Sequence, residues 1–503
     1  MSELLNIDGS DAHDGERVAS TGVAGLDVVT SGGLARNRLH LLEGQPGSGK
    51  STVSLQFLIA GRDRGERCLY VTLSESEEEL RAVAKSHGWD LNGIRIFEMT
   101  PSRASGEPPI HYTVFHPAEI ELGDAIAQII DEVQRDSPSR VVIDSLTELR
   151  LLARDLLHYR RQLLALKQFF LGRRCTVLVL DDTTGDDQVQ SIMHAVIALE
   201  QIATEYGAPR RRLHVSKYRG AQYRGGYHDF EIQRGGVAVF PRLMAPVAPA
   251  SSRVPRELMS TGLDELDDLI GGGLERGSSV LITGAAGTGK STLATQVAVA
   301  AAQRGERGAI FAFDESLRSL LMRSRGLGLE LEPHIERGAL LVRQMDPGHT
   351  SPGEFASLVM NAVERDGASV VIIDSLDGYL MSMPHERFLV VQLHELLMCL
   401  GDAGVATLMV GVQHGMLGPA IAHGPDASYL ADSVVLLRYF EAFGEVRQAI
   451  SVVKKRGGAH ERTIREFRIT RDGLRIGAPL REFRGVLTGV PDYHGPAQPL
   501  LDA

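Results

Sequence analysis

Apolar and polar positions alternate in blocks along the first half of the chain. Residues 68–73, 140–143 and 176–180 are short runs rich in apolar and β-branched side chains, and residues 77–87 form an amphipathic stretch typical of a helix. Strands that are buried on both faces have continuous apolar sequences. The pattern therefore predicts an α/β fold, with a mostly parallel sheet flanked by helices.

The pattern changes before residue 245. Residues 211–217, 227–232 and 236–240 are separated by turn signals. We expect them to form antiparallel hairpins that follow the parallel sheet.

The same order of segments occurs twice. Residues 20–22 (STG) and 32–34 (GGL) recur at 260–262 and 272–274, an offset of 240. The run 141–146 (VVIDSL) recurs as 371–376 (VIIDSL), and KYRG at 217–220 recurs as KKRG at 454–457. The offsets drift because loops tolerate changes in length.

Two copies of one domain are therefore expected. The predicted organisation is a flexible N-terminus (1–15), domain 1 (16–245), a linker rich in proline and serine (246–256), domain 2 (257–490) and a C-terminal tail (491–503).

Composition narrows the class of protein. The chain is 43% hydrophobic and 23% charged, with a formal net charge of −11. This balance is typical of globular domains and argues against non-specific binding to nucleic acid. No apolar run approaches the roughly 18 residues of a membrane span, so a cytoplasmic protein without membrane contact is expected.

A phosphate-binding loop is present in each copy. Residues 44–51 (GQPGSGKS) and 284–291 (GAAGTGKS) both match G-x-x-x-x-G-K-[ST]. The glycines let backbone N–H groups surround phosphate oxygens, the lysine neutralises the β/γ-phosphates and the hydroxyl holds Mg²⁺. An apolar run precedes each loop, so two ATP–Mg²⁺ sites per chain are predicted.

The predicted ATP-binding residues of the loops are Gly44, Gly47, Ser48, Gly49, Lys50, Ser51 and Thr52 in domain 1, and Gly284, Gly287, Thr288, Gly289, Lys290, Ser291 and Thr292 in domain 2. Lys50 and Lys290 are also expected to act in catalysis.

Acidic residues supply the remaining nucleotide chemistry. Asp144 and Asp374 end apolar runs, where a carboxylate can reach Mg²⁺, so they are predicted metal ligands together with Ser51 and Ser291. An alternative for the two aspartates is a surface cap on a turn.

Candidates for orienting the attacking water follow another apolar run in each copy. These are Ser74-Glu75 in domain 1 and Asp314-Glu315 in domain 2. We predict a catalytic role for Glu75 and Glu315, whereas residues 77–79 are expected to be a solvated acidic stretch.

Cationic residues recur near each domain end. Lys217, Arg219, Lys454 and Arg456 are too far along the chain to be local ligands, and such cations often contact the nucleotide of a neighbouring subunit. They are predicted to bind ATP in this way; the alternative is a basic hairpin that faces solvent.

The ordered set of motifs resembles the KaiC family, the double-domain RecA-like ATPases of the circadian clock. The resemblance covers about residues 16–490, and residues 453–457 (VKKRG) with 464–467 (IREF) are similar to the end of the family's second domain. It implies two tandem RecA-like P-loop NTPase domains. It further implies a two-tier homohexamer with ATP at subunit interfaces, a slow ATPase in the first ring and an autokinase in the second.

The resemblance also implies roles for single residues. Glu75, Asp314 and Glu315 occupy the family's catalytic carboxylate positions, and Ser74 replaces one acid in domain 1. Ser428 falls at the serine of the family's phosphoacceptor pair and is the predicted phosphorylation site, whereas Tyr429 replaces the threonine. A KaiB-like protein or a histidine-kinase-type signalling protein is a candidate partner.

Two other functions stay open at this point. A RecA-like DNA-dependent motor shares the fold, although the acidic balance argues against it. An ATP-dependent assembly scaffold with little turnover is the other; Glu75 and Glu315 argue against it, whereas Ser74 favours it for domain 1. Multiple-turnover release of phosphate separates a scaffold from an enzyme.

Overall fold

The computed structural model describes residues 17–99, 122–153, 155–182, 184–203, 207–244, 257–346, 348–381, 388–412, 427–471, 473–488 and 491–495. The predicted N-terminal segment 1–15, the predicted linker 246–256 and residues 496–503 of the predicted tail lie outside these ranges.

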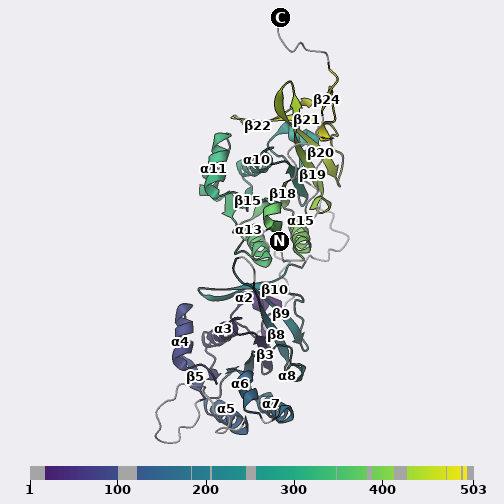
Figure 1. The fold of residues 1–503 in the computed structure, drawn as a ribbon. Coiled ribbons are helices and arrows are strands. Elements are labelled where there is room, and N and C mark those ends of the chain that lie inside the picture. The colour runs from purple at the N-terminus through teal and green to yellow at the C-terminus, as the bar shows by residue number, and fades with distance from the viewer. Residues whose placement is uncertain are drawn as a thin grey trace. The chain divides into compact units, whose positions relative to one another are not determined.

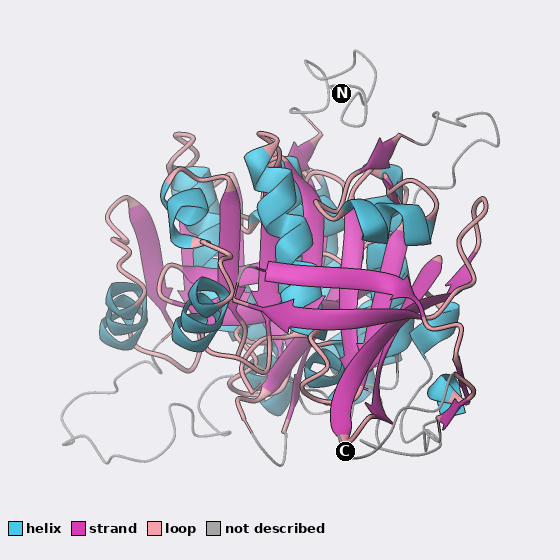
Figure 2. Cartoon of the chain, turned by 90° about the horizontal axis from the view of Figure 1, so that it is seen from above, coloured by secondary structure: helices cyan, strands magenta, loops and turns pink. Residues whose placement is uncertain are grey.

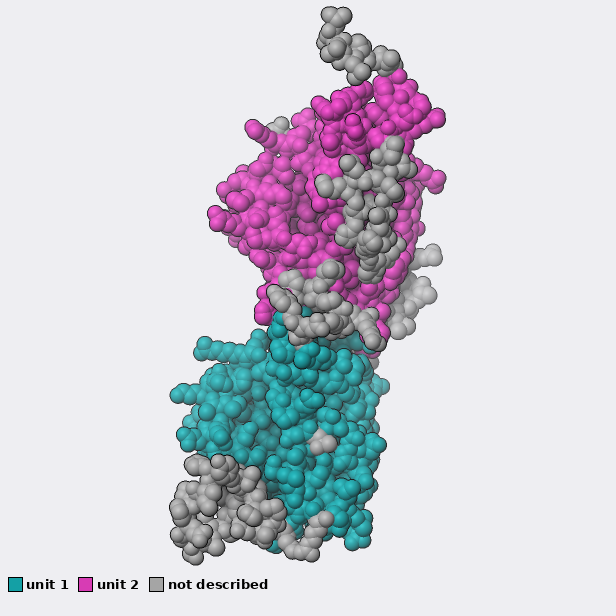
Figure 3. Space-filling view, viewed as in Figure 1, with its two compact units in different colours: residues 1–242 teal, residues 243–503 magenta. Residues whose placement is uncertain are grey.

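The chain divides into two compact units, residues 1–242 and 243–503 (Figure 3). Each unit contains one nine-stranded sheet.

In unit 1 the strands are β1 (Val18–Ala19), β2 (Leu34–Ala35), β3 (Leu39–Gly44), β4 (Cys68–Thr72), β5 (Ile94–Glu98), β6 (Arg140–Asp144), β7 (Thr176–Asp181), β8 (Ala195–Ile202), β9 (Arg210–Tyr218), β10 (His228–Gln233) and β11 (Gly236–Phe240) (Figure 1). The helices are α2 (Ala24–Val29), α3 (Lys50–Arg62), α4 (Glu77–Ser86), α5 (Leu122–Asp136), α6 (Leu146–Leu151), α7 (Leu156–Leu171) and α8 (Asp187–Ile192).

In unit 2 the strands are β12 (Leu258–Met259), β13 (Leu274–Glu275), β14 (Ser279–Gly284), β15 (Arg307–Ala312), β16 (Leu340–Gln344), β17 (Ala368–Asp374), β18 (Ala406–Val412), β19 (Ser433–Ala442), β20 (Glu445–Lys455), β21 (Arg465–Thr470), β22 (Gly473–Pro479), β23 (Phe483–Arg484) and β24 (Asp492–Tyr493). The helices are α9 (Asp264–Ile270), α10 (Lys290–Gln303), α11 (Leu317–Gly326), α12 (Glu332–Glu336), α13 (Pro352–Glu364), α14 (Leu376–Met381) and α15 (Leu389–Asp402), with short 3₁₀ turns η1 (Ala427–Tyr429) and η2 (Val486–Thr488).

The two large sheets have the same topology. The order is β5-β4-β6-β7-β3-β8-β9-β10-β11 in unit 1 and β16-β15-β17-β18-β14-β19-β20-β21-β22 in unit 2. The first six strands of each order are parallel, and the last three extend the sheet as antiparallel hairpins. This arrangement confirms the predicted tandem RecA-like α/β fold.

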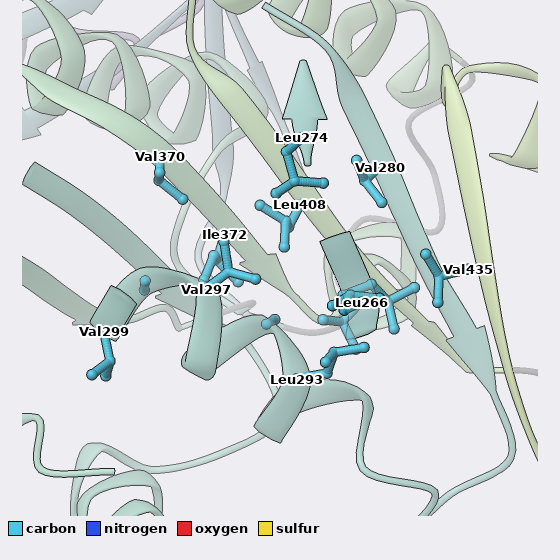
Figure 4. Close-up of a cluster of buried hydrophobic side chains, with 14 of the residues drawn as sticks. Leu266, Leu274, Val280, Leu293, Val297, Val299, Val370, Ile372, Leu408 and Val435 are labelled. Atoms are coloured by element: carbon cyan, nitrogen blue, oxygen red, sulfur yellow. The ribbon is translucent and has the colours of Figure 1, made fainter. Parts of the chain in front are cut away.

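Successive side chains of a strand point to opposite faces of the sheet. Both faces of each large sheet carry apolar side chains, and helices pack on both of them (Figure 2). In β3, Leu42 packs into the cluster on one face and Leu41 into the cluster on the other. In unit 2, one such cluster includes Val280, Val370, Ile372, Leu408 and Val435 from four strands, packed with Leu293 and Val297 of α10 (Figure 4).

The starts and lengths of the helices give two further findings. Ser76 and Glu79 form reciprocal hydrogen bonds that cap α4, so residues 77–79 form the first turn of the helix predicted over residues 77–87. None of the helices in the described ranges is long and apolar enough to cross a membrane.

Candidate functional site

Each phosphate-binding loop joins the carboxyl end of a strand to a helix. Gly44 ends β3 and Lys50 begins α3; Gly284 ends β14 and Lys290 begins α10. A Cβ on Gly44 would lie 2.6 Å from Ser48 Oγ and 2.7 Å from the Leu199 carbonyl oxygen, so this close turn requires glycine. Both loops thus have the strand–loop–helix setting in which backbone N–H groups hold phosphate.

The loop lysines fold back over the loops. Lys50 Nζ donates to the Gly44 carbonyl at 2.7 Å and lies 2.8 Å from Asp182 Oδ1. Lys290 Nζ donates to the Ala285 carbonyl at 2.8 Å, and burial lowers its pKa. Both ammonium groups therefore lie where the phosphates of a nucleotide would need a positive charge.

The predicted metal ligands of domain 2 are in direct contact. Ser291 Oγ donates to Asp374 Oδ1 at 3.1 Å, and burial raises the pKa of Asp374. A hydroxyl beside a carboxylate is a set of hard oxygen donors, which fits Mg²⁺.

In domain 1 the corresponding aspartate has another partner. Tyr70 is fully buried and its hydroxyl donates to Asp144 Oδ2 at 2.6 Å. Burial, followed by the charge of Asp144, raises the pKa of Tyr70, so the phenol stays a donor. Asp144 lies at the end of β6 as predicted, and the tyrosine orients its carboxylate from within the sheet.

Glu75 faces the same site from the loop after β4. The Leu73 amide donates to the Asp144 carbonyl at 2.8 Å, which ties this loop to the end of β6, and the Glu75 amide donates to Thr72 Oγ1 at 3.0 Å. Burial, and then the negative charge of Asp144, raises the pKa of Glu75. Among the residues that the structure describes, no group forms a hydrogen bond with its buried Oε2 atom, as suits an oxygen that orients water.

The corresponding acids of domain 2 are already paired. Glu315 Oε2 lies 2.9 Å from Arg323 Nη2, and Arg323 Nη1 donates to Thr292 Oγ1 at 3.0 Å. Asp314 accepts a hydrogen bond from Ser375 Oγ. The two sites therefore differ in how their acids are held, although the loops match.

Sequence reasoning missed Asp182 and Tyr70. Asp182 follows β7, and β7 lies between β3 and β6 in the sheet, which brings this carboxylate to Lys50. The available signal was an apolar run that ends in two aspartates, the same signal that identified Asp144. Nothing in the sequence alone distinguishes Tyr70 from a core aromatic residue.

The predicted cationic residues do not lie beside the phosphate loop of their own domain. Lys217 on β9 pairs with Val196 of β8. Val196 in turn pairs with Leu41, which lies in the first half of β3. Lys454 on β20 is likewise paired with Val434, which is level with Leu281. The phosphate loops follow the carboxyl ends of β3 and β14, so these cations lie towards the amino edge of each parallel sheet.

Ser428 lies at this amino edge in domain 2. It belongs to η1, which precedes β19. Lys454 Nζ donates to the Ser428 carbonyl at 2.8 Å, and Arg456 Nη2 donates to the Tyr429 carbonyl. The predicted phosphoacceptor and the predicted intersubunit cations therefore share one surface.

Comparison with known proteins matches most of the chain to one family. A family model described as "ATPase: KaiC" matches residues 19–244 and, a second time, residues 259–481. The circadian clock protein KaiC3 of Synechocystis sp. is 29% identical over 496 residues, 95% of either chain. The circadian clock oscillator protein KaiC of Synechococcus elongatus is 26% identical over 510 residues, 97% of this chain and 95% of the relative.

Proposed function

Because this chain belongs to the KaiC family of ATPases, we propose that it binds ATP with Mg²⁺ in both domains, hydrolyses ATP slowly in domain 1 and phosphorylates Ser428 in domain 2. The chains act as a cytoplasmic homohexameric signalling or timing switch, with ATP at subunit interfaces. A KaiB-like protein or a histidine-kinase-type signalling protein is the candidate partner. The observation that supports this most strongly is the recurrence of lysine, hydroxyl and strand-end carboxylate at both phosphate loops.

Nucleotide binding uses equivalent groups in the two domains. Lys50 and Lys290 offset the charge of the β/γ-phosphates. Mg²⁺, held by Ser51 with Asp144 and by Ser291 with Asp374, would neutralise charge on the phosphate oxygens when bound. Ser48 Oγ is buried and has no hydrogen-bond partner in the described part of the chain, so it suits a polar contact with the nucleotide.

In domain 1, Glu75 would orient a water molecule and accept its proton. The water oxygen forms a bond to the γ-phosphorus, the bond to the bridging oxygen breaks and ADP leaves. The unpaired Glu75 Oε2 and its raised pKa, caused first by burial, support this role.

In domain 2, the hydroxyl of Ser428 would replace water as the nucleophile. Asp314 or Glu315 accepts the hydroxyl proton, the serine oxygen bonds to the γ-phosphorus and ADP leaves. Arg323, which pairs with Glu315, would hold that carboxylate in position.

The location of the cations supports sites completed by a second chain. Within one chain, Ser428, Lys454 and Arg456 are at the amino edge of the sheet, whereas the phosphate loop is at the carboxyl edge. A head-to-tail contact between copies brings opposite edges together, and repetition of such a contact forms a ring when its rotation closes.

Mixing two inactive variants is expected to restore hydrolysis. In chains that carry Asp314→Asn and Glu315→Gln to silence domain 2, we combine Arg219→Ala subunits with Glu75→Gln subunits in equal amounts. Roughly a quarter of random head-to-tail interfaces then contain an intact Glu75 and an intact Arg219, so about a quarter of the domain 1 rate should return. Phosphate release measures the rate.

The matched control mixes Arg174→Ala subunits with Glu75→Gln subunits, because Arg174 is an exposed cation outside the predicted site. If the Arg219→Ala mixture releases phosphate no faster than the sum of the rates of its two components measured separately, the sites are not shared between subunits. A chain that stays monomeric with ATP at micromolar concentration would contradict them as well.

A further inference from the structure

The phosphate-binding lysine of domain 1 is paired with a carboxylate. Asp182 Oδ1 lies 2.8 Å from Lys50 Nζ, and Lys50 also donates to the main-chain carbonyls of Gly44 at 2.7 Å and Gln45 at 3.1 Å. The Asp182 side chain is 36% exposed, so the ion pair is open to solvent and to a ligand that enters beside the loop. The ammonium group that would meet the phosphates of a nucleotide therefore already has an anion beside it.

Hydrogen bonds hold the backbone that carries Asp182. Its amide donates to Thr147 Oγ1 at 3.1 Å, and this hydroxyl donates to Asp181 Oδ1 at 2.9 Å. Arg150 Nη2 lies 3.1 Å from Asp181 Oδ2 and 3.0 Å from Asp186 Oδ2, so the segment is tied down at both ends. The carboxylate of Asp182 is therefore kept close to the phosphate loop by contacts that do not depend on the lysine.

The charge of Asp182 also acts on three other carboxyl groups of the site. Burial is the first cause of the raised pKa of Glu75, Asp144 and Glu148, and the negative charge of Asp182 adds to the increase in each case. The charge of Lys50 acts in the opposite direction on Glu75 and Asp144. A triphosphate that entered without a metal would add its own negative charge to these carboxylates.

Domain 2 provides an internal comparison. Asp181 of β7 and Gly411 of β18 each pair with the residue that precedes the first glycine of a phosphate loop. The residues that follow them, Asp182 and Val412, are therefore equivalent. At the position where domain 1 has an acid beside its phosphate-binding lysine, domain 2 has an apolar side chain.

The lysine of domain 2 has a different setting as well. Among the residues that the structure describes, Lys290 forms no ion pair with a carboxylate. The charge of Asp377 acts on Lys290, but Asp377 itself accepts a hydrogen bond from the Val412 amide. Arg323, 2.9 Å from Glu315, supplies a second cation. Negative charge is thus offset more fully in the domain 2 site than in the domain 1 site.

We propose that Asp182 is a specificity-determining residue that restricts domain 1 to nucleotide in complex with Mg²⁺, whereas domain 2 accepts metal-free nucleotide more readily. The inference rests on the proposed binding of ATP with Mg²⁺ in both domains. The metal cancels part of the negative charge of the β/γ-phosphates and so weakens their repulsion by Asp182. Metal-free nucleotide meets that repulsion in full.

The test measures the dissociation constant of a labelled, non-hydrolysable ATP analogue by equilibrium dialysis, once with excess Mg²⁺ and once with EDTA. Full-length chains with Lys290→Ala report on domain 1, and full-length chains with Lys50→Ala report on domain 2. The ratio of the constant in EDTA to the constant in Mg²⁺ should be at least about tenfold larger for domain 1. Any change that affects both forms of the nucleotide equally cancels in this ratio.

Asp182→Val introduces the residue that domain 2 carries. In the Lys290→Ala chain it should lower the ratio for domain 1 at least about tenfold, because metal-free binding tightens more than binding with Mg²⁺. Asp182→Asn keeps the shape of the side chain and should lower the ratio as well. The control Asp187→Asn removes an exposed charge from the first turn of α8 and should leave the ratio unchanged.

Three results overturn the inference while the proposed function stands: equal ratios for the two domains, a domain 1 ratio that both Asp182 variants leave unchanged, or metal-free binding that stays undetectable in both variants. Binding with Mg²⁺ shows in the same experiment that each variant is folded. If either reporter chain fails to bind the analogue with Mg²⁺, the proposed function is contradicted and the inference falls with it.

Discussion

Replacing Glu75 by glutamine is expected to lower ATP hydrolysis in domain 1 at least about 100-fold while leaving ATP binding intact. The amide keeps the shape of the side chain but cannot accept a proton from the attacking water. Among the described residues, the Glu75 carboxyl has a buried oxygen without a hydrogen-bond partner, and the charges of Asp144 and Lys50 act on it. Phosphate release over many turnovers measures the effect, in chains whose domain 2 carries Asp314→Asn and Glu315→Gln.

The control for this substitution is Glu78→Gln. Glu78 is exposed in the first turn of α4, so the variant removes the same charge nearby and should hydrolyse ATP at the wild-type rate. Equal rates for Glu75→Gln and wild type would exclude Glu75 as the base. No turnover in wild type itself would favour the assembly scaffold over the enzyme.

Replacing Ser428 by alanine is expected to remove most of the label that the protein takes up from ATP labelled at the γ-phosphate. The serine lies beside Lys454 and Arg456, cations that can contact a phosphate held by a second chain. Asp314→Asn combined with Glu315→Gln should abolish the label, because neither amide accepts the hydroxyl proton. Phosphate is located by mass spectrometry of peptides after incubation with ATP.

Tyr429→Phe is the matched control for the acceptor. Tyr429 is exposed next to Ser428. The variant loses only the phenolic hydroxyl, so the amount of label taken up should be unchanged. Label that remains in Ser428→Ala and disappears in Tyr429→Phe would make the tyrosine the acceptor. Hydrolysis without any label in wild type would make the protein an ATPase switch without kinase activity.

Local features of the sequence predicted much of the fold. The apolar runs 140–143 and 176–180 correspond to β6 (Arg140–Asp144) and β7 (Thr176–Asp181), each one residue longer than expected. Buried parallel strands have a continuous apolar pattern, and the phosphate loop has a fixed strand–loop–helix setting. Both features can therefore be predicted from a short stretch of sequence. The repeat then transferred each assignment to the second domain.

Contacts that depend on the order of strands in the sheet could not be predicted from short stretches of sequence. The position of β7 between β3 and β6 brings Asp182 to Lys50, and the pairing of β4 with β6 brings Tyr70 to Asp144. Such pairings join residues far apart along the chain, and their register is set by the packed sheet.

One difference between the two domains could not be predicted from the sequence. The motifs distinguish the two sites by Ser74, which replaces an acid in domain 1. They do not show that Arg323 engages Glu315 in domain 2, whereas Glu75 has no such ion pair among the described residues of domain 1. The identical position of the acids says nothing about which partner the folded chain gives them.

The number of ATP molecules bound per chain tests the central claim most directly. Equilibrium binding of a labelled, non-hydrolysable ATP analogue with Mg²⁺ should give two molecules per wild-type chain. Lys50→Ala and Lys290→Ala should each bind one, because each removes the positive charge at one phosphate loop, and the double variant should bind none. One molecule per wild-type chain, or two per chain in either single variant, would contradict the account.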